Sequence, residues 1–132
     1  MQSYYYPMEK LPGISADEVQ LLHSVNITNT QELLALTKTL AEQQLLANKL
    51  KIKVEYVRKW TALADLARIK SVGCNYCGLI LHSGIISTQQ LSKVNAPTLH
   101  RQILRLQVAT LKRKDLCPSL SLIQQWIKEA KN

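Results

Sequence analysis

The chain has 132 residues, of which 46% are hydrophobic and 20% are charged, and this ordinary globular balance excludes wholesale disorder. Its 17 Lys and Arg exceed its nine Asp and Glu to give a net charge of +8, which indicates an anionic partner, most often nucleic acid or a membrane surface. Three cysteines favour reduced thiols over a disulfide framework, and no apolar run reaches the roughly 18 residues of a membrane span, so we expect a cytoplasmic protein.

Residues 1–10 lack a helical period and are predicted to form an arm. This start has neither the basic region nor the apolar stretch of a secretory leader, so no leader is expected. Tyr4, Tyr5 and Tyr6 lie in the arm, where they either stack on a partner or fold back over the domain. The sequence leaves both alternatives open.

Two helix starts follow the arm. Ser15 and Glu18 have the spacing of a capping box, in which each side chain bonds the other residue's backbone N–H. They predict a helix that runs to about Val25. Asn29 and Glu32 have the same spacing and predict the start of a second helix.

A third and a fourth helix complete the first half of the chain. Thr39 and Glu42 predict a helix that ends near Leu50, and a further helix is expected from about Lys53 to Arg68. Its apolar face is predicted to hold Val54, Val57, Trp60, Ala64 and either Leu66 or Ala67.

The second half repeats the first with an offset of 58 residues, which separates Leu21 from Leu79 and Ile27 from Ile85. The helix-start residue Asn29 likewise corresponds to Ser87. We predict two tandem units of about four helices each, residues 11–68 and 69–132. Because a unit of roughly 60 residues buries little surface alone, the units are expected to share a core.

The last two helices of the second unit follow the same plan. Asn95 and Pro97 predict the start of its third helix, and Pro118 that of its fourth. Trp60 and Trp126 are 66 residues apart and are the expected core anchors, so the second unit has gained about eight residues, placed around 112–115. No segment alternates as a strand does, and the predicted fold class is all-α.

Residues 69–84, Ile-Lys-Ser-Val-Gly-Cys-Asn-Tyr-Cys-Gly-Leu-Ile-Leu-His-Ser-Gly, resemble a helix-hairpin-helix, with Cys77 as the small residue four positions after the hairpin. Over residues 11–131, the chain resembles an uncharacterised tandem family known mainly from cyanobacteria and labelled only as a domain of unknown function. The resemblance implies a fold and no established activity.

In helix-hairpin-helix proteins that bind DNA, backbone N–H groups of the glycine turn and of the next helix contact phosphate. The first hairpin here keeps Gly13 but has Ser15 at the second glycine position. The second hairpin has Ser71 at the first position and keeps Gly73. Both hairpins are therefore either phosphate contacts or purely structural turns.

The charges near the two hairpins differ. Lys70 lies beside the second hairpin, whereas Asp17 and Glu18 lie beside the first. The sequence thus favours the second hairpin, with Lys70, Ser71 and Gly73, as the one that contacts phosphate.

Residues 46–60 have the pattern of a helix-turn-helix, with Ala47 and Leu50 before the turn and Val57 and Trp60 facing inward after it. Lys51 stands where that turn usually has glycine. Three outward residues would then face a DNA groove: Tyr56, Arg58 and Lys59. The alternative is an ordinary meeting of two helices at a short turn.

The positive charge is concentrated in the second half, since residues 1–68 carry +1 and residues 69–132 carry +7. Arg101 and Arg105 are four residues apart and share a helix face, where they are predicted to contact successive phosphates. The densest basic cluster is Arg101, Arg105, Lys112, Arg113 and Lys114. The alternative is an exposed helix and loop without a ligand.

No metal site, cofactor or catalytic centre is predicted. Cys74 and Cys77 have the spacing of a zinc knuckle, and Cys117, His82 and His100 are further candidates, but a second pair of that spacing is missing. Cys77 is instead expected to be a small buried residue. Paired carboxylates, a nucleophile elbow and a phosphate-binding loop are all lacking, so an enzyme with a small-molecule substrate is not expected.

The sequence therefore predicts a non-catalytic binding module. The first hypothesis is sequence-independent nucleic-acid binding, DNA in particular, through the basic second unit. The second is a protein-interaction adaptor whose hairpins are structural. A membrane partner is not expected, because no helix combines a basic face with a wide exposed apolar one.

Overall fold

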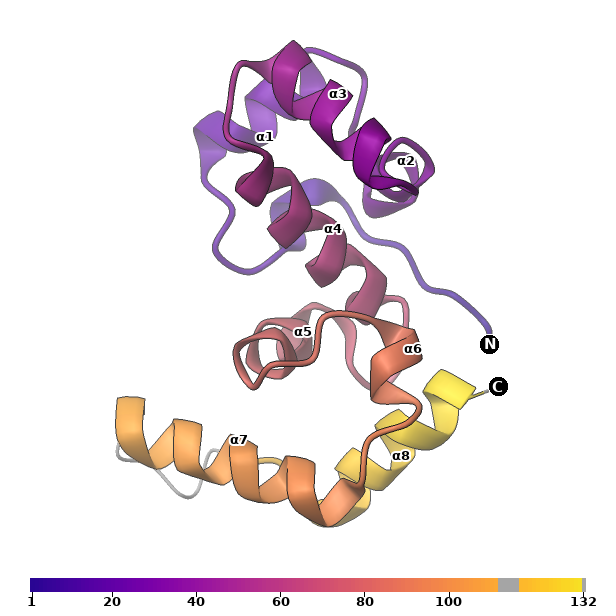
Figure 1. Ribbon diagram of the computed structural model, residues 1–132, viewed down its shortest axis with the longest axis vertical. Helices are drawn as coiled ribbons and strands as arrows, with labels where there is room; N and C mark the ends of the chain where they lie inside the picture. Colours follow the sequence, from indigo (N-terminus) through magenta and orange to yellow (C-terminus); the bar gives the residue numbers. More distant parts are fainter. Residues whose placement is uncertain (112–116, 132) are drawn as a thin grey trace.

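The computed structural model describes residues 1–111 and 117–131, and within these ranges the chain forms eight α-helices and no strand (Figure 1). The prediction of an all-α fold is confirmed. The elements are η1 (Met8–Lys10, a 3-10 helix), α1 (Ala16–His23), α2 (Thr30–Ala35), α3 (Leu40–Leu50), α4 (Val54–Ala67), α5 (Gly73–His82), α6 (Thr88–Leu91), α7 (Ala96–Leu111) and α8 (Leu120–Lys131). None of them has both the length and the apolar character needed to cross a membrane.

The predicted caps form. Ser15 and Glu18 make a capping box at α1, with N···O distances of 2.9 and 3.1 Å. Asn29 accepts a hydrogen bond from the backbone N–H of Glu32 (2.8 Å) at α2. Ser87 accepts the equivalent bond from Gln90 at α6, so the same device recurs 58 residues later. Local sequence therefore determines where these helices begin.

The packing of the helices recurs in the two halves of the chain. In the first half α4 packs against α2 and α3, and in the second half α8 packs against α6 and α7. The short η1 has the place that the last turn of α4 has in the second half, and their residues Met8 and Leu66, 58 apart, are both fully buried. These repeated contacts support the prediction of two similar units.

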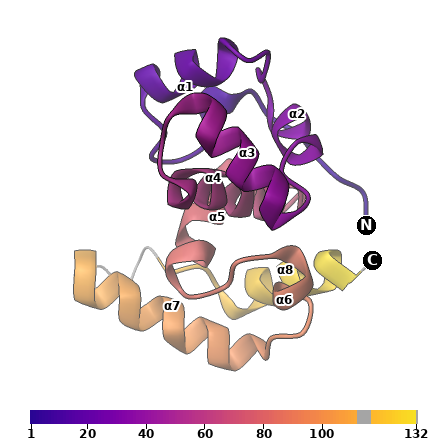
Figure 2. The ribbon, with the colours of Figure 1, turned by 45° about the horizontal axis from the view of Figure 1, so that its top comes forward.

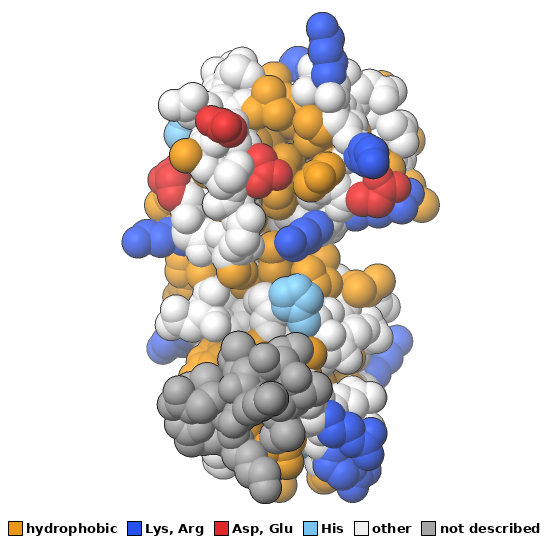
Figure 3. Space-filling view, turned by 90° about the vertical axis from the view of Figure 1, so that its left-hand side faces the viewer, with side chains coloured by type: hydrophobic (Ala, Val, Ile, Leu, Met, Phe, Trp, Pro, Cys, Tyr) orange, Lys and Arg blue, Asp and Glu red, His pale blue; other side chains and the backbone are white. Residues whose placement is uncertain are grey.

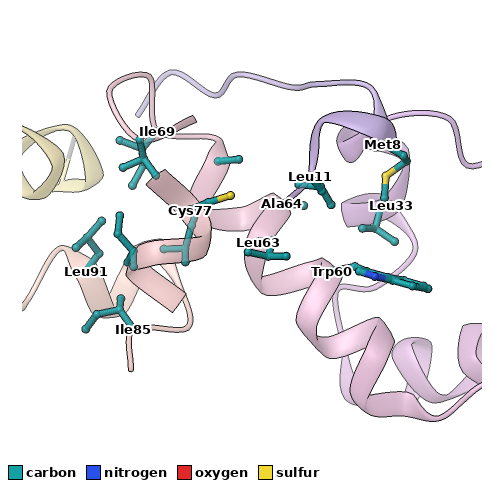
Figure 4. Close-up of a cluster of buried hydrophobic side chains, with 14 of the residues drawn as sticks. Met8, Leu11, Leu33, Trp60, Leu63, Ala64, Ile69, Cys77, Ile85 and Leu91 are labelled. Carbon is teal, nitrogen blue, oxygen red and sulfur yellow. The ribbon is translucent and has the colours of Figure 1, made fainter. Parts of the chain in front are cut away.

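One hydrophobic cluster joins the two halves, because α4 also packs against α5. Figure 2 shows α4 and α5 between the other helices of the first half and those of the second. In the close-up, Leu63 and Ala64 of α4 lie between the side chains around Trp60 and those around Cys77 (Figure 4). Trp60 and Trp126 are 3% and 0% exposed, so both predicted anchors are core residues.

The N-terminal arm folds back over the domain. Tyr4 donates its backbone N–H to the carbonyl oxygen of Arg68 (3.0 Å). Tyr6 and Thr30 exchange two bonds, from Tyr6 N–H to the Thr30 hydroxyl (3.0 Å) and from Thr30 N–H to the Tyr6 carbonyl (2.8 Å). The Tyr6 ring packs against the core, while Tyr5 remains 42% exposed.

An ion pair takes the place of the arm in the second half. Thr88, which corresponds to Thr30, donates its backbone N–H to Asp65 (2.8 Å). Arg68 donates to the Thr88 hydroxyl (3.1 Å) and pairs with Asp65 (2.7 Å). The same buried helix start is thus satisfied by backbone in one half and by side chains in the other.

Candidate nucleic-acid interface

The second hairpin is held by contacts within the protein. Ser71 donates its backbone N–H (2.9 Å) and its hydroxyl (2.7 Å) to the two oxygens of the Glu129 carboxylate. Its carbonyl accepts a bond from the indole N–H of Trp126 (3.1 Å). Since α8 occupies every polar group of Ser71, none of them is offered to phosphate in this structure.

Gly73 is also directed inward. It is buried, with φ +52°, and its N–H donates to the Ile69 carbonyl (2.9 Å). A Cβ at this position would lie 3.3 Å from the Tyr6 hydroxyl, so the arm covers the turn. Of the three residues predicted at this hairpin, Lys70 alone is exposed. We therefore leave Ser71 and Gly73 out of the proposed interface.

The Glu129 carboxylate gives the fold an expected pH dependence. Partial burial raises its pKa, but hydrogen bonds from Ser71 and Gln125, with the Lys70 charge nearby, outweigh burial and hold the pKa below the ordinary 4.5. The stabilisation is therefore complete above pH 4.5 and is lost as the pH falls through the lowered pKa. We expect Glu129→Gln to lower the free energy of unfolding by about 1 kcal/mol at about pH 7 and by less at about pH 3. Urea unfolding of both proteins at the two pH values measures this, and a difference independent of pH would contradict it.

The first hairpin is more open. Gly13 is exposed with φ +78°, and the Lys59 ammonium nitrogen lies 3.7 Å from the position that a Cβ on Gly13 would take. Within the described residues, the N–H groups of Gly13 and Ile14 have no hydrogen-bond partner. The fold thus brings together two predicted residues, Gly13 and Lys59, and favours the first hairpin as a phosphate contact, opposite to the expectation from local charge.

The segment predicted as a helix-turn-helix has the expected distribution of side chains. Lys51 has a left-handed backbone with φ +58°, which explains why this position usually holds glycine. Ala47, Leu50, Val57 and Trp60 are buried as predicted. The outward side chains Tyr56, Arg58 and Lys59 are all exposed, and the Tyr56 ring lies 6.4 Å from that of Trp60.

The basic face of the second half lies on α7. Arg101 and Arg105 are exposed, whereas Leu99 and Ile103 on the opposite side of the helix are fully buried. No carboxylate pairs with either arginine in the part of the chain that the structure describes, where Arg101 contacts only the Thr98 hydroxyl at 3.5 Å. The predicted residues Lys112, Arg113 and Lys114 lie outside the described residues.

The charge asymmetry is visible on the surface. Residues 69–111 contain no Asp or Glu. On the face that Figure 3 shows, acidic side chains appear over the half that carries α1 to α4, and the other half shows Lys, Arg and His. The second half thus presents cations without neighbouring acids.

The cysteines are not arranged as metal ligands. Cys77 is fully buried, Cys74 and Cys117 are half-buried, and all three are free thiols. Burial raises the pKa of Cys77 to about 12, which disfavours the thiolate that a metal would need. In the described residues no three His, Cys, Asp or Glu side chains gather as a possible metal site.

Comparison with known proteins gives one match. Residues 12–132 match the family described as a domain of unknown function (DUF4332), in agreement with the resemblance noted in the sequence. No curated protein and no solved structure matches the chain.

Proposed function

Since the chain belongs to the family of the domain of unknown function DUF4332, we propose its function from its own residues: it is a non-catalytic module that binds the phosphate backbone of DNA through its basic second half. No cofactor takes part. The observation that carries the proposal is the unpaired, exposed arginine pair on α7 in a stretch, 69–111, without acidic residues.

The geometry of the pair suits phosphate. Residues four apart on a helix are separated by about 6 Å along its axis and point to the same side. The planar guanidinium groups of Arg101 and Arg105 each offer two N–H donors in the arrangement that matches phosphate oxygens. Because phosphate contacts read no base edges, binding is expected to be independent of sequence.

Two further cations extend this surface. Lys70 is exposed beside the second hairpin, and Lys59 approaches the exposed Gly13 turn of the first. Both offer additional phosphate contacts, although the Asp17 and Glu18 charges weaken the potential near Gly13.

Titration of a labelled DNA duplex of about 20 base pairs, at about 50 and about 200 mM salt, tests the proposal. Each phosphate contact contributes about −0.9 to the slope of log affinity against log salt, so about three contacts lower the affinity about 40-fold over this range. Absence of saturable binding at the lower salt would overturn the proposal. Affinity unchanged by salt would remove its electrostatic basis.

A further inference from the structure

An open groove of about 860 Å³ runs along α4, between α2 and α3 on one side and α5 with the turn before α6 on the other. Its apolar lining comes from all of these segments: Leu34, Ala35, Leu40, Ala62, Leu81 and Ile86. The groove lies between the two halves of the chain and contains neither Arg101 nor Arg105.

Large apolar side chains stand at its edges. Leu40 is 71% exposed, Ile86 is 63% exposed and Tyr5 is 42% exposed, and all three line the groove. They come from α3, the turn before α6 and the N-terminal arm. Single exposed apolar residues are common, but several around one groove mark an interaction surface.

The charged lining is positive. Lys38, Arg58 and Lys59 line the groove, are exposed, and have no carboxylate partner in the described residues. The one acid among the lining residues, Asp65, is already bonded to Arg68 and to the backbone N–H of Thr88. An apolar floor with free cations at the edge is complementary to an apolar partner that carries carboxylates.

We propose that this groove binds an amphipathic helix of a protein partner, with leucine-type side chains on one face and Asp or Glu along its flanks. The apolar face packs on Ala62, Leu40 and Ile86 in the i, i+3, i+4, i+7 manner of a helix in a groove. The flanking acids meet Lys38 and Arg58, which sets orientation and excludes basic helices. This binding is separate from DNA binding.

The exposure of the edges favours a helix over a small apolar ligand. Small-molecule sites enclose most of their ligand's surface. Here Leu40 and Ile86 extend into solvent on opposite sides of an open groove, and an elongated partner lying between them covers both.

Three labelled peptides of about 18 residues, a length that supports helix formation, test the proposal. They share one leucine face and carry Glu, Gln or Lys at every other position. In anisotropy titrations with the full chain, the Glu peptide is expected to bind about tenfold more tightly than the Gln peptide, and the Lys peptide most weakly.

Substitutions locate the binding. Leu40→Glu and Ile86→Glu should each weaken binding of the Glu peptide by at least about tenfold, because each puts a carboxylate where a leucine would pack. Leu45→Glu is the matched control, since Leu45 is 68% exposed on the same helix α3 and does not line the groove. All three sites are exposed, and circular dichroism verifies that each variant is folded.

Three outcomes would overturn the proposal: no saturable binding of the Glu peptide, equal affinity for the Glu and Lys peptides, or an equal loss from Leu45→Glu. Binding of dodecanoate that is lost in Leu40→Glu, without peptide binding, would assign the groove to an apolar ligand instead. The double variant Arg101→Glu and Arg105→Glu should bind the Glu peptide normally, which separates this result from the test of DNA binding.

Discussion

Trp126→Ala should lower the free energy of unfolding by about 3–5 kcal/mol, a large part of the roughly 5–15 kcal/mol that stabilises a domain. Trp126 is fully buried, its ring centroid lies 5.2 Å from that of Tyr76, and its indole N–H donates to the Ser71 carbonyl. The substitution leaves a cavity between α8 and the second hairpin and removes the bond. Urea unfolding followed by circular dichroism measures the loss.

Trp126→Phe separates the two contributions. It retains most of the apolar ring but leaves the Ser71 carbonyl without its donor, so a loss of about 1–2 kcal/mol is expected. Leu45→Ala, at an exposed position, should change stability by no more than about 0.5 kcal/mol. A loss below about 1 kcal/mol for Trp126→Ala would contradict the close packing of α8 on the hairpin.

The features that could be predicted from the sequence are those that depend on neighbouring residues or on the repeat. Ser15 with Glu18 and Asn29 with Glu32 are three apart, so their caps need no knowledge of the fold. The burial of Trp60 and Trp126 follows from helical periodicity and from their matching places.

The burial of Met8 was missed, because the short arm shows no periodicity. One signal was available: at the offset of 58 residues Met8 corresponds to Leu66, so the repeat extends back into the arm. A longer comparison of the two halves would have placed Met8 in the core.

The state of the hairpins could not be predicted, because it depends on residues far apart in the chain. Local charge favoured the second hairpin, but Glu129 lies 58 residues from Ser71 and occupies its donors. Likewise, Lys59 reaches Gly13 only because α4 packs beside the first hairpin. The apolar groove depends in the same way on how α4 and α5 join the two halves.

Charge reversal at Arg101 and Arg105 is the second large effect that we expect. Arg101→Glu with Arg105→Glu should weaken binding of duplex DNA by about 2 kcal/mol, or about thirtyfold, because two charge-assisted contacts are lost. The salt slope should also decrease by about 0.9 for each lost contact. Stability should change little, since both side chains are exposed on α7. Titration at several salt concentrations measures the affinity and the slope together.

The matched control is Lys49→Glu with Lys53→Glu, which reverses two exposed charges in the first half. Because Glu42 and Glu55 already offset the potential there, this pair should cost less affinity than the arginine pair. Equal losses from both pairs would move the interface to the helix-turn-helix segment at residues 46–60, with Arg58 and Lys59 as its contacts. If neither pair changed the affinity, α7 would not be the DNA-binding face, and the apolar groove along α4 would be the better-supported interaction surface of this protein.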